Sequence, residues 1–99
     1  MLVHSVYFWL KPDLSEDERA AFRLGLESLA GIDGAAAVYI GTPAATAERP
    51  VVERSYDYGL TVVVPDVAGH DAYQADPIHQ AFVERFKPCW TRIMVTDFD

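Results

Sequence analysis

Cysteine is almost absent from this sequence, and its scarcity limits where the chain can work. Cys89 is the only cysteine, so no disulfide bond can form within the chain. A sequence without internal disulfides is typical of a reducing compartment. Met1 is followed at once by an apolar stretch, with neither a basic leader nor a cleavage-site pattern. We therefore expect an intracellular protein that is cytoplasmic.

Positive charge and long hydrophobic runs are also scarce. Eight lysines and arginines stand against fifteen aspartates and glutamates, giving a formal net charge of −7 at pH 7. Such a chain offers phosphates no basic surface, which argues against nucleic acid and anionic membranes as partners. The longest apolar run, Leu60 to Val64, is interrupted by Thr61 and is far too short to cross a bilayer.

Several chemical motifs are missing as well. The three histidines and the scattered carboxylates show no metal-ligand spacing, and no glycine-rich loop is present to hold phosphates. RNA-binding domains can share the order of elements described below. Their basic, aromatic third-strand signature is nevertheless absent from residues 58–62. We expect no metal and no organic cofactor.

Hydrophobic residues, by contrast, are abundant. They make up 51% of the 99 residues, enough for one compact domain over residues 1–99. The stretch Leu2 to Leu10 alternates two rows of side chains, and both rows are largely apolar. A strand with one face in water would show a polar row. This strand is therefore expected to be covered on both faces, by helices on one side and by a second subunit on the other.

The remaining elements follow from turn residues, capping residues and periodicity. Ser15 and Glu18 form a capping box that opens a helix, and Asp76-Pro77 restarts a helix after a break. The expected elements are strand 2–10, helix 15–30, strand 36–40, loop 42–55, strand 56–64, helix 66–75, helix 77–87 and strand 90–98.

This order predicts an α+β, ferredoxin-like βαββαβ fold with a four-stranded antiparallel sheet and helices on one face. The other face would carry an apolar patch too large to leave in water. Two such sheets packed together would form a dimeric α+β barrel. The residues expected in this homodimer interface are Val3, Tyr7, Trp9, Val63, Met94 and Phe98.

Three segments resemble the stress-responsive A/B barrel (Dabb) family, and the resemblance covers nearly the whole chain. They are Val3-His4-Ser5-Val6, the stretch from Tyr73 to Val83, and Val95-Thr96-Asp97-Phe98. Family members commonly carry His-Pro-x-His in the middle segment, whereas this chain has Asp76 in place of the first histidine and retains His79. The family includes a plant polyketide cyclase that needs no metal or organic cofactor, and the resemblance implies a catalytic set of His4, His79 and Tyr73.

The residues themselves also favour a pocket between the sheet and the helices. His4 shares its strand row with Val6 and Phe8, and His79 shares its helix face with Phe82, so both imidazoles are expected to face one apolar core. His70 lies on the same helix side as Tyr73, either bordering the pocket or partly exposed. The expected pocket walls are Val6, Phe8, Phe22, Leu26, Leu60, Val62, Phe82, Trp90, Ile93 and Val95.

Three functions are compatible with these residues. The first function is cofactor-free cyclase, lyase or isomerase chemistry on a small apolar carbonyl compound. Two imidazoles can exchange protons at neutral pH, and Tyr73 would orient the carbonyl oxygen. The second is a non-enzymatic stress or assembly protein, in which the same residues only hydrogen-bond within the core. The third is a cofactor-independent monooxygenase, which no particular residue selects.

Overall fold

The computed structural model describes residues 1–99 as four strands and three α-helices. Two short 3-10 turns, Leu29–Gly31 and Lys87–Cys89, continue α1 and α3 respectively. The elements in chain order are β1 (Leu2–Leu10), α1 (Glu16–Ser28), β2 (Ala37–Gly41), β3 (Tyr58–Val64), α2 (Val67–Ala75), α3 (Pro77–Phe86) and β4 (Trp90–Phe98).

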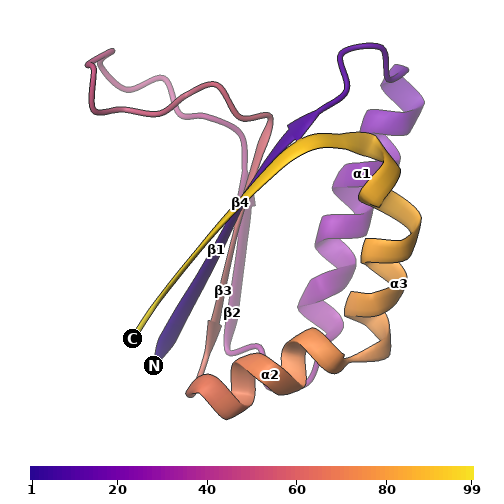
Figure 1. Cartoon of the computed structure of the whole chain (residues 1–99), viewed down its shortest axis with the longest axis vertical. Coiled ribbons are helices and arrows are strands. Elements are labelled where there is room, and N and C mark those ends of the chain that lie inside the picture. The colour runs from indigo at the N-terminus through magenta and orange to yellow at the C-terminus, as the bar shows by residue number, and fades with distance from the viewer.

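The strands form one sheet in the order β2-β3-β1-β4, and each neighbouring pair is antiparallel. All three α-helices cover the same face of this sheet, as Figure 1 shows. The predicted ferredoxin-like α+β fold is therefore confirmed. It places β1 at the centre, with β3 and β4 as its hydrogen-bonded neighbours.

Capping residues begin each helix where the sequence predicted. Ser15 accepts a hydrogen bond from the Glu18 backbone N–H, and Glu18 accepts one from the Ser15 N–H, which completes the capping box of α1. Asp76 ends α2 and caps α3 by accepting from the Ile78 N–H, with Pro77 in the first turn.

The bounds of β1 and β4 agree with the prediction, whereas those of the other five elements shift by one or two residues. β2 runs one residue later than predicted, and α1 ends at Ser28 because Leu29–Gly31 tighten into a 3-10 turn. β3 begins at Tyr58 rather than Tyr56. Asp57 is diverted from the strand, because its N–H donates to the Phe8 carbonyl and its carboxylate accepts from the Leu10 N–H.

The core lies between the sheet and the helices and is rich in aromatic rings. Phe22 of α1 is fully buried and meets Phe8, Phe82, Phe86 and Trp90 with ring centroids 5.3 to 6.4 Å apart. Edge and tilted contacts of this kind add to the free energy gained from apolar burial. They fix α1 and α3 against the same stretch of β1.

The opposite face of the sheet carries no helix (Figure 1). Tyr39 and Phe98 are 66% and 63% exposed, and Ser5 hydrogen-bonds Thr61 at 2.9 Å near the centre of this face. The six residues predicted for the homodimer interface belong to rows on this side. None of the three helices combines the length and the apolar character that a membrane span requires.

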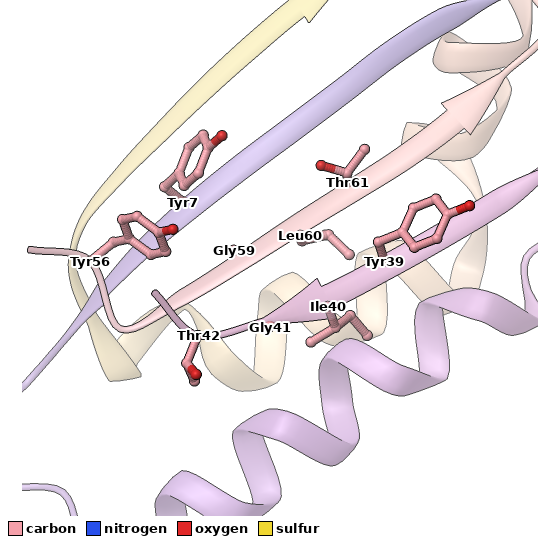
Figure 2. A pocket seen from close by; sticks show the side chains of 9 residues that line it. All are labelled: Tyr7, Tyr39, Ile40, Gly41, Thr42, Tyr56, Gly59, Leu60 and Thr61. Carbon is pink, nitrogen blue, oxygen red and sulfur yellow. The ribbon is translucent and has the colours of Figure 1, made fainter. Parts of the chain in front are cut away.

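The segment between β2 and β3 extends on this helix-free side, away from the helices (Figure 1). At its base the Trp9 indole N–H donates to the Ser55 hydroxyl at 2.9 Å, and the Arg92 guanidinium stacks over the Trp9 ring. Figure 2 shows a hollow beside it, where Tyr7 and Tyr56 flank Gly59 and Tyr39 stands further along the sheet, on β2. This hollow contains no imidazole, carboxylate or cationic side chain among its lining residues.

Gly25 gives a direct test of the packing between α1 and α3. A Cβ atom at this position would overlap the Phe86 ring, so Gly25→Ala is expected to destabilise the protein by about 1–3 kcal/mol in spite of alanine's higher helix propensity. Urea unfolding measures the effect. Gly31→Ala is the matched control, because the nearest atom to its added Cβ is the Ile78 Cδ1 at 3.9 Å. Equal stability of the two variants would contradict the packing described here.

Candidate ligand-binding site

A cavity of about 310 Å³ lies between the helix-facing side of the sheet and helices α2 and α3. Ile93 and Val95, which point to this side from the edge strand β4, remain 43% and 47% exposed, so the cavity opens along β4. Most of the side chains that line it are apolar, and a few are polar. The lining consists of His4, Val6, Phe8, Leu29, Leu60, Tyr73, Gln74, His79, Phe82, Val83, Lys87, Trp90, Ile93 and Val95.

The structure brings together most of the side chains that the sequence placed in the pocket. His4, His79 and Tyr73 all line the cavity, together with Val6, Phe8, Leu60, Phe82, Trp90, Ile93 and Val95. Gln74, Val83, Lys87 and Leu29 line it without having been predicted.

Three predicted wall residues do not line the cavity. Phe22, Leu26 and Val62 are each 0% exposed and belong to the packed core. Helical and strand periodicity correctly marked them as inward-facing. Periodicity could not distinguish side chains that border a cavity from side chains that are completely covered by α1 and its neighbours in the core.

His4 is the more buried of the two imidazoles that line the cavity. It is 3% exposed, and its Nδ1 lies 2.6 Å from the Oδ1 of Asp97. Asp97 is the direct partner of His4 across the antiparallel pair of β1 and β4, so the sheet register itself holds the two side chains together. A carboxylate in this position orients the ring with Nδ1–H toward Asp97 and leaves the Nε2 lone pair free.

Asp97 was missed as a site residue. It shares a strand row with Ile93 and Val95, which the sequence analysis assigned to the pocket, and alternation alone would have placed Asp97 on that row. The antiparallel register of β1 and β4 then makes it the neighbour of His4. That pairing is a tertiary fact, which spacing along one strand does not contain.

Tyr73 presents an unpaired hydroxyl to the cavity. Its side chain is 2% exposed, its Oη is buried, and no protein group hydrogen-bonds it. Burial raises the pKa of Tyr73 to about 12, so the hydroxyl keeps its proton at neutral pH. Its ring contacts both imidazoles, with centroid distances of 5.9 Å to His4 and 5.0 Å to His79. A buried hydroxyl without a partner is rare, because leaving it unpaired costs about 1–3 kcal/mol.

His79 is half-buried on α3 and is held neutral. Burial lowers the pKa of His79, and so does repulsion from the imidazolium form of His4, against a hydrogen bond to the Gln74 backbone that acts in the opposite direction. An imidazole of this kind carries one N–H donor and one free lone pair at neutral pH.

His70 borders the site from the side of Asp97 rather than lining the cavity. Its ring centroid is 5.0 Å from that of His4, and its Nε2 is 4.0 Å from the Oδ1 of Asp97. Its Nδ1 is 3.0 Å from a carboxylate oxygen of Asp71. The helix side predicted for His70 is therefore compatible with its position, although the contact with Asp97 was not predicted.

The model of the stress responsive A/B barrel domain family matches residues 2–99 of the sequence. The chain belongs to this family. The resemblance found in its three segments is thereby confirmed over nearly the whole length. A comparison with curated proteins found no match.

Solved structures share the fold at low sequence identity. A Dabb family protein with a ferredoxin-like fold from Mesorhizobium loti has a TM-score of 0.79 and 24% identity, with 99% of this chain and 94% of that chain covered. A dimeric ferredoxin-like protein of unknown function from Thermobifida fusca has a TM-score of 0.79 and 19% identity, with 98% and 88% covered. The hydroxynitrile lyase from Passiflora edulis has a TM-score of 0.78 and 19% identity, with 98% and 90% covered.

The lowered pKa of His79 predicts a specific dependence of stability on pH. Because the folded protein binds this proton less readily than the unfolded chain, stability falls as the pH drops from the ordinary histidine pKa of about 6.5 toward the lowered value. His79→Gln removes this contribution. Urea unfolding at about pH 7.5 and about pH 5.5 is expected to show a smaller acid-induced loss for the variant than for the native chain. An equal loss in both proteins would contradict the lowered pKa.

Proposed function

We propose that this family member binds a small, largely apolar carbonyl compound in the cavity that opens along β4, and that it catalyses a proton transfer at the carbon next to the carbonyl group. The observation that carries the proposal is the unpaired Tyr73 hydroxyl, buried in an apolar cavity between two imidazoles. A ligand oxygen accepting from this hydroxyl would supply the hydrogen bond that the protein itself leaves unmade.

The chemistry follows from the three side chains and from Asp97. His4 is the base: a C–H bond next to the carbonyl breaks, the proton passes to Nε2, and the bonding electrons form an enolate. Asp97 stabilises the imidazolium that results, because its carboxylate accepts from Nδ1–H at 2.6 Å. Asp97 is thus a positioning residue, acting through His4.

Tyr73 and His79 complete this proposed step. The Tyr73 hydroxyl donates to the oxygen on which negative charge develops, a contribution that grows in a cavity shielded from water. His79 is assigned the role of acid, which it fills in its imidazolium form: its lowered pKa makes that form a minor one at neutral pH but a stronger proton donor. Return of the proton to another carbon gives isomerisation, and attack of the enolate carbon on a second carbonyl of the same compound gives cyclisation. Both outcomes balance without an oxidant or reductant.

The comparisons support this class of reaction without selecting a substrate. A hydroxynitrile lyase has the same fold, so the architecture is compatible with lyase activity in a structural neighbour. The walls of the cavity are mainly aliphatic and aromatic, which favours an apolar body for the ligand.

We further propose that two chains associate through the helix-free faces of their sheets to form an α+β barrel. The face carries exposed Tyr39 and Phe98 together with half-buried aromatic and aliphatic side chains, and several structural neighbours are described as dimeric ferredoxin-like proteins. The proposed interface residues are Val3, Tyr7, Trp9, Val63, Met94 and Phe98.

Tyr73→Phe separates catalysis from packing. Because the hydroxyl has no partner, its removal is expected to leave the free energy of unfolding unchanged or to raise it by up to about 1 kcal/mol. The same change is expected to slow enolisation of benzoylacetone, a small aromatic β-diketone followed by ultraviolet absorbance, by about 100-fold.

Tyr39→Phe is the matched control, since it removes a tyrosine hydroxyl from an exposed position on the other face. His4→Ala is expected to slow enolisation by about 100-fold or more, the usual contribution of a general base. If native protein and Tyr73→Phe accelerate the reaction equally, the proposed role of Tyr73 is wrong; if neither accelerates it, the non-enzymatic alternative is favoured.

Met94→Glu tests the proposed interface. Met94 lies on the helix-free face opposite Tyr7, so a carboxylate there would be buried against the second sheet and is expected to convert dimers into monomers. Sedimentation equilibrium measures the change. Leu24→Glu, at a side chain 65% exposed on α1, is expected to leave the association state unchanged. A native protein that sediments as a monomer would contradict this interface.

A further inference from the structure

Two imidazoles and a carboxylate meet beside the cavity, at the end of the sheet covered by α2. His4, His70 and Asp97 each offer one ligand atom, and these atoms lie within 4.8 Å of one another. We propose that this cluster is a binding site for a divalent transition-metal ion, with Zn²⁺ or Co²⁺ as the fitting class. The site goes beyond the proposed function, in which no metal takes part.

The backbone already positions the three donors. His4 and Asp97 are direct partners across β1 and β4, and their side-chain atoms Nδ1 and Oδ1 are 2.6 Å apart. His70 reaches them from α2, with its Nε2 4.0 Å from the same Oδ1. The donors come from separate parts of the sequence, so spacing along the chain gives no sign of a metal site.

The hydrogen bonding of His70 favours a cation. Asp71 lies 3.0 Å from its Nδ1, and a carboxylate there accepts the Nδ1 proton. The Nε2 atom then carries a lone pair that lies 3.4 Å from the side-chain amide nitrogen of Gln74, which can donate to it, and 4.0 Å from the Oδ1 of Asp97, a second acceptor. A metal ion that replaces this long contact with Gln74 would be attracted by both the Nε2 lone pair and the Asp97 carboxylate. A carboxylate behind a ligating histidine is also a common outer-shell arrangement, which orients the ring and strengthens it as a ligand.

The donor set and the spacing fit zinc-like ions. Tetrahedral sites with bonds of about 2.0–2.1 Å separate their ligand atoms by about 3.3 Å, and the distances here, from 2.6 Å to at most 4.8 Å, lie on either side of that value. Two imidazoles and one carboxylate suit Zn²⁺ and Co²⁺ better than Mg²⁺ or Ca²⁺, which prefer oxygen ligands. The Asp97 side chain is 41% exposed, which gives an ion access from solvent.

Occupation of the site would change the role of His4. A metal ion on Nδ1 requires that atom to be unprotonated, so the remaining ring proton moves to Nε2. The nitrogen that serves as base in the proposed function then becomes a donor. Metal binding and proton abstraction by His4 are therefore mutually exclusive, and the ion acts as an inhibitor.

The test is a titration of metal-free native protein with Co²⁺, followed by its visible absorption bands and by calorimetry. One ion per chain is expected to bind. His70→Ala and Asp97→Ala are each expected to weaken binding by at least about 10-fold, because loss of a ligand costs at least as much affinity as loss of its outer-shell partner. His79→Ala is the matched control, because this third histidine lies outside the cluster and is expected to leave Co²⁺ affinity unchanged.

A further variant, Asp71→Asn, keeps the test decisive if His70→Ala or Asp97→Ala does not fold. Asp71 is 72% exposed and touches only the outer side of His70, so Asp71→Asn is expected to fold normally and to weaken Co²⁺ binding about 10-fold. Binding of less than one ion per chain by native protein, or equal affinity in native protein and Asp71→Asn, would overturn the proposal. The titration uses no substrate, so its outcome is independent of whether enolisation is observed.

Discussion

The structure depends on how the central strand β1 is buried. Its helix-facing row contains Val6 and Phe8, 5% and 1% exposed, and in the same row one imidazole, His4, must be accommodated without contact with water. A buried imidazole needs hydrogen-bond partners, and the edge strand β4 supplies one by placing Asp97 directly opposite. The pair is thus built into the register of the sheet.

The same arrangement explains why the site is open. β4 is an edge strand, and its helix-facing residues Ile93 and Val95 are only partly covered. Helices α2 and α3 meet at the Asp76-Pro77 break and bring Tyr73 and His79 over this uncovered margin. An apolar cavity with a polar end results, and the polar end contains the one buried side-chain hydroxyl that no protein group satisfies.

Much of this could be predicted from the sequence, because the signals are local. The apolar rows of β1, the capping box at Ser15 and the Asp76-Pro77 break gave the order of elements and the helix-covered face. Phe22 and Leu26 were assigned to the cavity wall because periodicity reports only that a side chain faces inward. Asp97 and His70 were not recognised as neighbours of His4, since their meeting depends on strand register and on the position of α2, neither of which is a property of spacing along the chain.

In this structure Asp97 holds the His4 ring with its proton on Nδ1 and a free lone pair on Nε2. Long-range ¹H–¹⁵N correlation spectra of metal-free protein at neutral pH report this tautomer directly. The His4 Nδ1 is expected to be protonated and hydrogen-bonded and its Nε2 unprotonated, and Asp97→Ala is expected to lose this preference. A His4 ring that carries its proton on Nε2 in the native protein, unaffected by the substitution, would contradict it.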